Sequence, residues 1–395
     1  MRKIYASIVA MFALTLTGTS FADSPAPAIA WGNNDYGQCD VPPGEAFVQI
    51  AAGNSHTIGL RSDGTAIAWG DNYYGQCDVP PGETFVQVFA GTYHNIGLRA
   101  DGTAIAWGAN FYGQCDVPAG ETFTQIAAGN YHNIGLRAKG TAIAWGLNDF
   151  GQSDVPAGET FVEIAAGRSY TIGLRADGTA IAWGDNYHGQ CDVPAGETFV
   201  EVAAGKSHTI GLRAGGTAIA WGYNYYGQCD VPAGETFVQV FAGENHSIGL
   251  RSDSTAIAWG RNNYGQCDVP AGETFVQISG GGSHTSGLLG ESGCCFGTDC
   301  ITVTEELCAE TGGTWLDGHG CYDCGEPPIP TGACCVSTGC HAISETACSD
   351  MGGTWLGEGG VCDDCPASCA GDTDGNGVIN IHDLLNMIAA WGACP

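Results

Sequence analysis

The segment GDTDGNGVINIHD, residues 371–383, carries the pattern with the clearest chemistry in the chain. Oxygen-bearing residues recur at positions 1, 3, 5, 7, 9 and 12 of a twelve-residue loop, and a glycine at position 6 permits the sharp turn between them. Hard cations such as Ca²⁺ prefer such a set of oxygen ligands. The alternative is an acidic turn ahead of a helix, because apolar residues follow at helical spacing. The sequence predicts a calcium site with the ligands Asp372, Asp374, Asn376, Val378 (through its carbonyl), Asn380 and Asp383.

Two cysteine-rich modules precede this loop, at residues 291–325 and 326–365. Each reads Cys-Cys, four residues, Cys, seven residues, Cys, twelve or thirteen residues, Cys, two residues, Cys. Modules this small bury too little apolar surface to fold without cross-links, so we expect three disulfides in each, with the pairing left open. Zinc is the alternative, but each module has one Cys-x-x-Cys where zinc modules usually have two. The cysteines are Cys294, Cys295, Cys300, Cys308, Cys321 and Cys324 in the first module and Cys334, Cys335, Cys340, Cys348, Cys362 and Cys365 in the second.

The segment 366–395 contains two further cysteines, Cys369 and Cys394, on either side of the calcium loop and its helix. Because they lie outside both modules, their number leaves them only each other, and a disulfide between them is expected to support the loop. The loop and helix resemble one repeat of a type I dockerin, a family with two such repeats. That resemblance implies attachment to a cohesin-like or other surface-anchoring partner through Ile381 and His382, and a maturation tag is equally consistent with it.

A histidine and a cysteine recur in the first two-thirds of the chain at a constant spacing. One histidine per repeat places neighbouring rings too far apart to share a metal ion, so we expect each to hydrogen-bond within its own loop. The cysteines of the GQCDVP segments are expected to be buried free thiols, because equivalent points far from a ring axis are too distant for disulfides. The residues are His56, His94, His132, His208, His246 and His284, with Tyr170 in the fourth unit, and Cys39, Cys77, Cys115, Cys191, Cys229 and Cys267, with Ser153 in the fourth unit.

These residues belong to seven units marked by tryptophans that are each 38 residues apart, from Trp31 to Trp259. Within a unit, TFVQVFAG, NIGLR and AIAWG each indicate a strand, and an Asp-Gly hairpin separates the second from the third. QCDVP suggests a short fourth strand. Four strands repeated seven times predict a mainly β chain with a seven-bladed β-propeller at residues 23–290, followed by two small disulfide-rich modules and a short calcium loop and helix.

The frame AAG..H..GL..DGT...WG.N..GQ resembles the repeat of the regulator of chromosome condensation family of propellers, and the resemblance covers about residues 28–290. It implies the propeller fold and says little about function. Secreted bacterial relatives of this propeller include protein inhibitors of enzymes. Because the first unit lacks its leading strands and the last lacks its final one, the strand 28–31 is expected to pair with 285–289 and close the ring.

The loops after each Trp-Gly and before each repeated histidine are expected to lie at the same end of the blades. Their residues vary, whereas the scaffold does not, and loops that vary on a repeated scaffold are where recognition is usually placed. Tyr together with Asn and Ser is typical of surfaces that bind proteins or sugars, although drift in unconstrained loops is the alternative. The predicted ligand-binding residues are Tyr73, Tyr93, Phe111, Tyr131, Tyr187, Tyr223 and Tyr225.

The bulk composition narrows the class of partner. The chain of 395 residues has a formal net charge of −30, which disfavours nucleic acid and anionic membrane surfaces. Residues 1–22 read as a secretory signal peptide, and no later stretch is long and apolar enough for a membrane span. We therefore expect a secreted protein, whether extracellular, periplasmic or at the cell surface, in which disulfides are permitted.

The function predicted from the sequence is non-enzymatic recognition of an extracellular protein or glycan through one face of the propeller, with Ca²⁺ bound in a C-terminal attachment segment. A carbohydrate-active or lyase-type enzyme is one alternative, and it would need acids or an oriented base converging in one pocket. A protein inhibitor of an enzyme is the other, favoured by the resemblance to secreted relatives.

Overall fold

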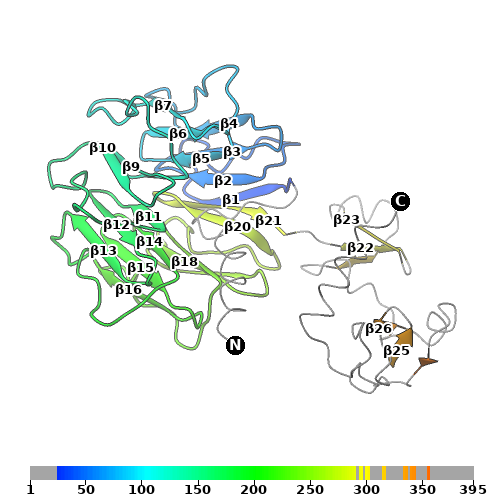
Figure 1. Cartoon of the computed structure of the whole chain (residues 1–395). Helices are drawn as coiled ribbons and strands as arrows, with labels where there is room; N and C mark the ends of the chain where they lie inside the picture. Colours follow the sequence, from blue (N-terminus) through cyan, green and yellow to red (C-terminus); the bar gives the residue numbers. More distant parts are fainter. Residues whose placement is uncertain are drawn as a thin grey trace, which may run out of the picture. The chain divides into compact units, whose positions relative to one another are not determined.

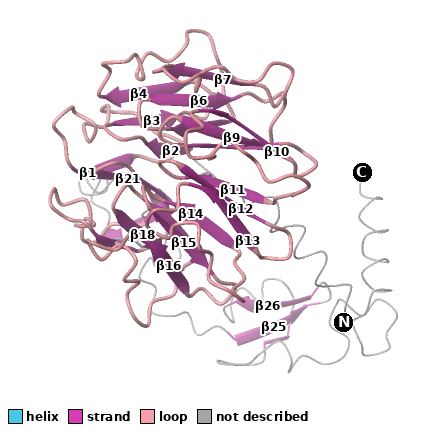
Figure 2. Ribbon diagram, turned by 90° about the vertical axis from the view of Figure 1, so that its left-hand side faces the viewer, coloured by secondary structure: helices cyan, strands magenta, loops and turns pink. Residues whose placement is uncertain are grey.

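The computed structural model describes residues 25–290 and, beyond them, the strands β22 (Gly293–Phe296), β23 (Asp299–Thr302), β24 (Thr314–Leu316), β25 (Gly332–Val336), β26 (Gly339–Ile343) and β27 (Thr354–Trp355). The chain divides into two compact units, residues 1–291 and 292–395. The predicted signal peptide, the predicted calcium loop and the cysteines Cys369 and Cys394 lie outside the described residues, as do the side chains of the cysteine modules. Strands and loops make up all of the described part (Figure 2), which holds no helix able to cross a membrane.

Residues 25–290 form seven three-stranded antiparallel sheets, which we call blades (Figure 1). The inner strands are β2 (Gln49–Ala52), β5 (Gln87–Ala90), β8 (Gln125–Ala128), β11 (Glu163–Ala166), β14 (Glu201–Ala204), β17 (Gln239–Ala242) and β20 (Phe275–Gly280). The middle strands are β3 (His56–Leu60), β6 (His94–Leu98), β9 (His132–Leu136), β12 (Tyr170–Leu174), β15 (His208–Leu212), β18 (His246–Leu250) and β21 (His284–Leu289). The outer strands are β1 (Ala28–Gly32), β4 (Ala66–Gly70), β7 (Ala104–Gly108), β10 (Ala142–Gly146), β13 (Ala180–Gly184), β16 (Ala218–Gly222) and β19 (Ala256–Gly260).

The seven blades close into a ring, here called the blade ring. Each inner strand contacts the inner strand of the next blade, and β2 contacts β20 to complete the cycle. The last blade is built from both ends of this region, because β1 pairs with β21 in a register that sets Ala28 opposite Leu288 and Gly32 opposite His284. The closure predicted from the sequence is therefore confirmed. Backbone hydrogen bonds within the last blade therefore tie the two ends of this region together.

The fourth strand predicted for each QCDVP segment is absent from the described blades, which have three strands each. Asparagine explains the difference. In the first unit the side chain of Asn34 accepts from the backbone N–H of Cys39 at 2.8 Å and donates to the carboxylate of Asp40 at 2.7 Å. These bonds, with Gly37 at a φ of 79°, hold the segment in a pair of tight turns. The same bonds recur in the other six units, so the backbone donors that a strand would need are already used.

The apolar core lies between neighbouring blades. Ile58 and Leu60 of one blade, for example, cluster with Phe85, Val88 and Trp107 of the next. Phe85 stacks on Trp107 with ring centroids 5.7 Å apart, and an equivalent Phe–Trp pair occurs in every blade. The ring of Phe85 also approaches the backbone of Gly97 so closely that an added Cβ would lie 2.2 Å from it. The glycine of the repeated Gly-Leu sequence is therefore required by the aromatic pair.

Ser254 is the one non-glycine residue with a positive φ, at 68°, among the described residues. It occupies the hairpin position where the other units have glycine, as at Gly216 with a φ of 81°. A side chain in this conformation costs about 1–3 kcal/mol.

We expect Ser254→Gly to raise the free energy of unfolding by about 1 kcal/mol and Gly216→Ser to lower it by a similar amount. Urea unfolding of the two variants checks this, and equal midpoints for both and for the wild type would contradict it.

Candidate functional site

The loops after the tryptophans and before the repeated histidines lie at the same end of the blades, as predicted. In the second unit the backbone N–H of Asp71, two residues after Trp69, donates to the carbonyl of Ser55 at 2.8 Å. The equivalent bond recurs in every blade. Asn33 donates to Ser283 in the closing blade, for example, and Arg261 donates to Asn245. The Asp-Gly hairpins lie at the other end of the same strands. We call the first end the loop face and the second the hairpin end.

The predicted aromatic residues lie on this loop face, and several are strongly exposed. Tyr73 is 83% exposed, Phe111 63%, Tyr187 86% and Tyr225 78%. Aromatic side chains that are this exposed are available to a binding partner.

These residues fall into two aromatic groups. In the first, Tyr74 contacts three neighbours, with centroid distances of 4.8 Å to Tyr73 and 5.2 Å to both Tyr93 and Phe111. Tyr131 joins it through Tyr93 at 6.1 Å and through Tyr112 at 5.1 Å. The second group lies three blades further on and contains Tyr187, His188, Tyr223, Tyr225 and Tyr226.

The sequence prediction missed Tyr74, Tyr112, His188 and Tyr226, which link the predicted residues to one another. All four occupy the fifth position after the tryptophan, where an aromatic residue stands in six of the seven units. That regularity made the position look like scaffold. His188 is the single histidine at this position, which is aromatic in the other six units, and it was the signal that could have drawn attention to the position.

The repeated histidines join neighbouring blades. His56 Nε2 lies 2.9 Å from Asn95 Oδ1 in the next blade, and Asn95 Nδ2 donates to the carbonyl of Gln76 at 2.6 Å. Because that amide nitrogen is already donating, its oxygen must accept from the histidine N–H. The same link recurs from His94, His132, His208, His246 and His284 to Asn133, Thr171, Ser247, Thr285 and Thr57.

The structural role expected of the histidines is confirmed, but their predicted partner is wrong, since the bond reaches the next blade and not the residue's own loop. Tyr170 keeps the link in the fourth unit by donating from its hydroxyl to the carbonyl of His208. Burial lowers the pKa of His94 and His246 to about 4 and that of His132, His208 and His284 to about 3. These rings therefore remain neutral and committed to the scaffold at physiological pH.

The repeated cysteines are free thiols, as predicted, although they are half-buried and not fully buried. Cys39 donates its S–H to the carbonyl of Asn33 at 3.3 Å, and five further cysteines make the matching bond. Burial raises the pKa of Cys39 and Cys115 to about 11 and that of Cys77, Cys191, Cys229 and Cys267 to about 12. Because the thiolate is the reactive form, these cysteines are poor nucleophiles and metal ligands. Across the described residues, no group of three or more His, Cys, Asp or Glu side chains could hold a metal ion.

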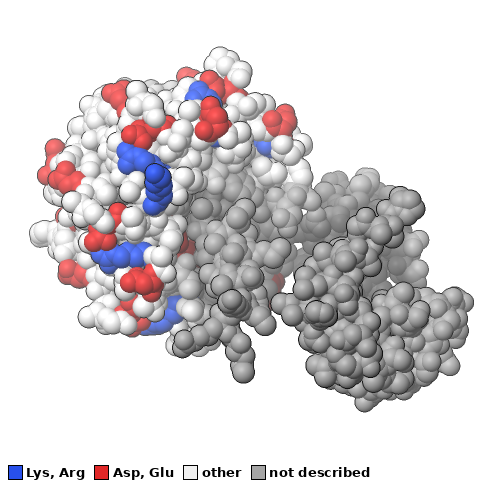
Figure 3. Space-filling view, in the orientation of Figure 1, with Lys and Arg blue, Asp and Glu red and all other residues white. Residues whose placement is uncertain are grey.

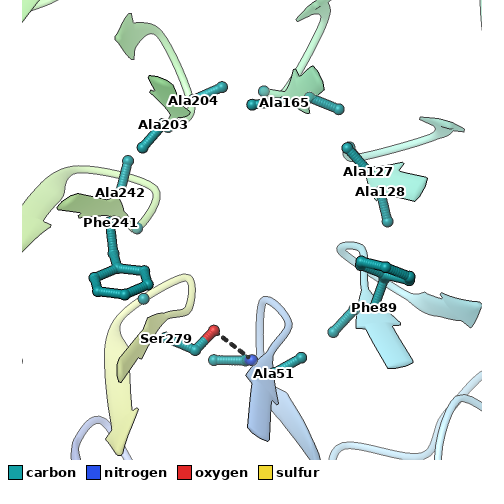
Figure 4. Close-up of a pocket in the computed structure, with 18 of the residues that line it drawn as sticks. Ala51, Phe89, Ala127, Ala128, Ala165, Ala203, Ala204, Phe241, Ala242 and Ser279 are labelled. Carbon is teal, nitrogen blue, oxygen red and sulfur yellow. Dashed lines mark hydrogen bonds between the residues drawn. The ribbon is translucent and has the colours of Figure 1, made fainter. Parts of the chain in front are cut away.

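A channel runs through the centre of the ring and is lined by the small residues of the inner strands (Figure 4). Ala51, Ala127, Ala165 and Ala203 leave it open, while Phe89 and Phe241 line its margin and pack into the core between blades. Ser279 links the closing blade to the first by accepting from the backbone N–H of Ala52 at 2.9 Å. The inner strands are rich in alanine because seven blades converge here and leave room mainly for small side chains.

Glutamine side chains join several neighbouring inner strands. Gln49 Oε1 accepts from the N–H of Val88 in the next blade at 2.8 Å, and its Nε2 donates to the Val88 carbonyl at 2.9 Å. Two adjacent blades have glutamate at this position, Glu163 and Glu201, which accept from Val202 and Val240 at 3.2 Å. A carboxylate cannot supply the donated bond, whereas a protonated carboxyl can. Burial raises the pKa of Glu163 well above its usual range and that of Glu201 to about 8.

The closed ring of sheets defines a β-propeller-like repeat protein. Within it, six segments match the regulator of chromosome condensation (RCC1) repeat, at residues 47–76, 85–114, 123–152, 161–190, 199–228 and 237–266. The chain thus carries six RCC1 repeats, and the blade closed by β1 completes the ring. None of the curated proteins matches the sequence.

Solved structures with the same fold support this assignment. The chain is similar to Prp20p from Saccharomyces cerevisiae, with 17% identity and a TM-score of 0.60 over 75% of this chain and 96% of that one. It is also similar to the ectodomain of the Physcomitrella patens receptor kinase CR4 (25% identity, TM-score 0.54, 61% of this chain and 70% of that one). A third similar structure is the CRINKLY WD40 ectodomain of the Arabidopsis thaliana receptor kinase ACR4 (23%, 0.53, 61% and 92%). At its low identity, the likeness to Prp20p shows the fold alone.

The buried acids and histidines predict opposite pH effects on stability. The raised glutamate pKa values mean that the folded state binds more protons than the unfolded state between about pH 4.5 and 8, so stability falls as the pH rises through that range. The lowered histidine pKa values have the reverse effect, and stability falls as the pH drops from about 6.5 towards 4.

We therefore expect the double variant Glu163→Gln/Glu201→Gln to melt above the wild type at pH 9 by more than about 4 °C, and the difference to shrink towards pH 5. Thermal unfolding followed by circular dichroism across this range measures it. The reciprocal variant Gln125→Glu, at the same position one blade earlier, should melt lower than the wild type, most of all at pH 9. A pH-independent difference for the double variant would show that the glutamates are not protonated in the folded protein.

Proposed function

We propose that this protein is a non-enzymatic recognition protein that binds a protein or a glycan through its loop face. The observation that carries the proposal is the distribution of sequence variation. The side chains that lock the blades together repeat almost unchanged, whereas the exposed side chains of the loop face differ from blade to blade. A fixed scaffold with variable loops at one end is the usual arrangement of a binding surface.

The chemistry of the scaffold side chains supports a binding role over catalysis. The histidines donate to the neighbouring blade and stay neutral, and the thiols have raised pKa values. The arginines that end the middle strands pair with glutamates, as Arg61 does with Glu45 at 2.6 Å. The repeated histidines, thiols and glutamates of the described blades are thus engaged in structural bonds.

The similar structures support the same direction. Prp20p binds Gsp1p and histones, and the CR4 and ACR4 structures are ectodomains of receptor kinases. A fold of this kind can therefore present a surface to protein partners and can do so outside the cell. For the present chain, the signal peptide read in residues 1–22 and the cysteine-rich modules favour a secreted or cell-surface location.

The C-terminal segment 366–395 completes the proposal as an attachment device. Its calcium loop and the Cys369–Cys394 disulfide would fold it around Ca²⁺ for a cohesin-like or surface-anchoring partner. The support for this part is the spacing of oxygen ligands in the sequence.

Replacing Tyr73, Phe111, Tyr187 and Tyr225 together with Ser should abolish capture of the partner from the organism's secreted and surface material while leaving the fold intact. Loss of the exposed rings removes contact area and costs little stability, because these side chains are largely outside the core. A pull-down with the whole protein, compared by mass spectrometry, checks this. The matched control replaces Val86, Val162 and Val238, which are exposed elsewhere, with Ser. Capture that survives the aromatic replacements would exclude these residues as the binding site.

Calcium should bind the full chain with a dissociation constant on the order of 10⁻⁴ to 10⁻³ M, as extracellular modules do. Asp372→Ala/Asp374→Ala should remove the binding, because two of the charged ligands are lost. Isothermal titration calorimetry measures both proteins, and Asp363→Ala/Asp364→Ala, which changes two acids outside the loop, is the control. Equal calcium binding by the wild type and the loop variant would show that the loop is only an acidic turn.

A further inference from the structure

A cavity of about 290 Å³ opens on the loop face among the three successive blades β11–β13, β14–β16 and β17–β19. Its volume lies at the lower end of the range of small-ligand pockets, which is about 300–1,000 Å³. Residues that depart from their counterparts in the other units make up most of its wall. The lining residues are Arg168, His188, Lys206, Ser207, Tyr223, Tyr226, Asn245 and Arg261.

The positive charge of this cavity stands out against an acidic chain. Of the 12 Lys and Arg residues, two lie in the first three positions and six arginines pair with glutamates within their own blades. On the face drawn in Figure 3, basic groups lie next to acidic ones in this way. Lys139 lies in a hairpin. The three cations that remain, Arg168, Lys206 and Arg261, all line the cavity.

The side chain of Arg261 is held in place, and one of its hydrogen-bond donors has no acceptor among the described residues. Its guanidinium carbon lies 5.3 Å from the ring centre of Tyr226 and 5.8 Å from that of Tyr264, so two aromatic faces fix its position. Its backbone N–H donates to the carbonyl of Asn245 at 2.9 Å. Yet its Nε is buried and has no hydrogen-bond partner among the described residues. A buried donor left unpaired is costly, and an anion in the cavity would satisfy it.

The charge balance of the wall is positive and suits an anion. Lys206 Nζ lies 3.1 Å from a carboxylate oxygen of Glu244, which offsets part of its charge. Arg168 and Arg261 form no ion pair within 4 Å in the described part of the chain, so they supply the net positive charge. Screening confines such an attraction to about 8–10 Å, so the acidic remainder of the chain does not cancel it for a group inside the cavity. A long polyphosphate would extend beyond that range into the acidic surface, whereas a single carboxylate would not.

Aromatic rings flank the cations. Tyr223 in the wall lies 4.6 Å from His188 and is nearly parallel to Tyr225, with a 17° angle and 6.3 Å between centroids. Tyr187 and Tyr225 rise beside it with more than three-quarters of their surface exposed. Flat rings next to hydroxyl and amide groups fit a sugar, whose C–H face packs on tyrosine while its hydroxyls bond to side chains such as Ser207 and Asn245.

We propose that this cavity binds a uronate residue of an acidic glycan, with the carboxylate at Arg261, Lys206 and Arg168 and the sugar ring against Tyr223. The proposal rests on the proposed function and deepens it by naming the ligand class for this part of the loop face. An acidic peptide would satisfy the cations equally well, but it would leave the exposed tyrosine faces without a flat partner.

The test is isothermal titration of the full chain with hexagalacturonate in calcium-free buffer at 50 mM salt, beside a neutral galactose hexamer. We expect the uronate to bind at least 10-fold more tightly than the neutral sugar and to weaken as salt is raised. Arg168→Gln/Lys206→Gln/Arg261→Gln should weaken it at least 10-fold, and Arg261→Gln alone should account for much of the loss. Lys139→Gln, which removes a cation at the hairpin end, is the matched control and should bind as the wild type does. Thermal unfolding verifies that each variant is folded.

Absence of hexagalacturonate binding, or equal binding by the wild type and the triple variant, would overturn the proposal. Tighter binding of hexaglutamate or of inorganic phosphate than of the uronate would overturn the assignment to a glycan. The outcome is separable from that of the proposed function. If the four-aromatic variant loses capture of surface material while uronate fails to bind, recognition through the loop face stands and the ligand class falls.

Discussion

The blade ring depends on one hydrogen bond that crosses from each blade to the next. A buried histidine donates to Asn, Thr or Ser in the following blade, and that residue donates back to a glutamine carbonyl of the first. The indole N–H of a tryptophan donates to the same carbonyl, as Trp107 does to Gln76 at 3.1 Å. The loop after each tryptophan is thereby fixed against its neighbour, and the exposed side chains on that loop inherit a defined position. Together with the glutamine bonds between the inner strands, this relay adds directional contacts to an apolar surface that by itself sets no unique angle between the blades.

Most of the fold could be predicted from the sequence, because a constant repeat, three strand patterns and a glycine hairpin agree with one another at every unit. The pairing of β1 with β21 could be predicted because the first unit lacks its leading strands and the last unit lacks its final strand. Two predictions failed for the same reason. The fourth strand and the histidine partner depended on which group satisfies a backbone or ring donor, and the competing acceptor lies elsewhere: Asn34 for the first, and Asn95, 39 residues away from His56, for the second. The first bond lies within one unit but depends on a side chain that competes with strand pairing, and the second joins two units, so strand patterns and repeat spacing show neither.

The candidate site divides in a similar way. Sequence variation identified the loop face and its exposed rings, since both are properties of single positions. The cavity at Arg168, Lys206 and Arg261 could not be found by comparing equivalent positions, because its residues come from two kinds of loop on three successive blades. Folding brings the loop before the histidine of one blade beside the loop after the tryptophan of the next. The residues Glu163 and Glu201 illustrate the opposite case, in which a substitution visible in the sequence acquires its meaning only from burial in the channel.

Because both ends of this region contribute to the last blade, the order of the blades along the chain could change without changing the blade ring. Ala28 and Leu288 face each other as Cα partners on adjacent strands, at the hairpin end of the ring. A short linker could therefore join these two ends while new termini are opened at any of the Asp-Gly hairpins. Such circular permutants would retain the loop face, because all of its loops lie at the other end of the strands. A cavity now built from the later units could in this way be moved to the beginning, middle or end of a polypeptide without altering its walls.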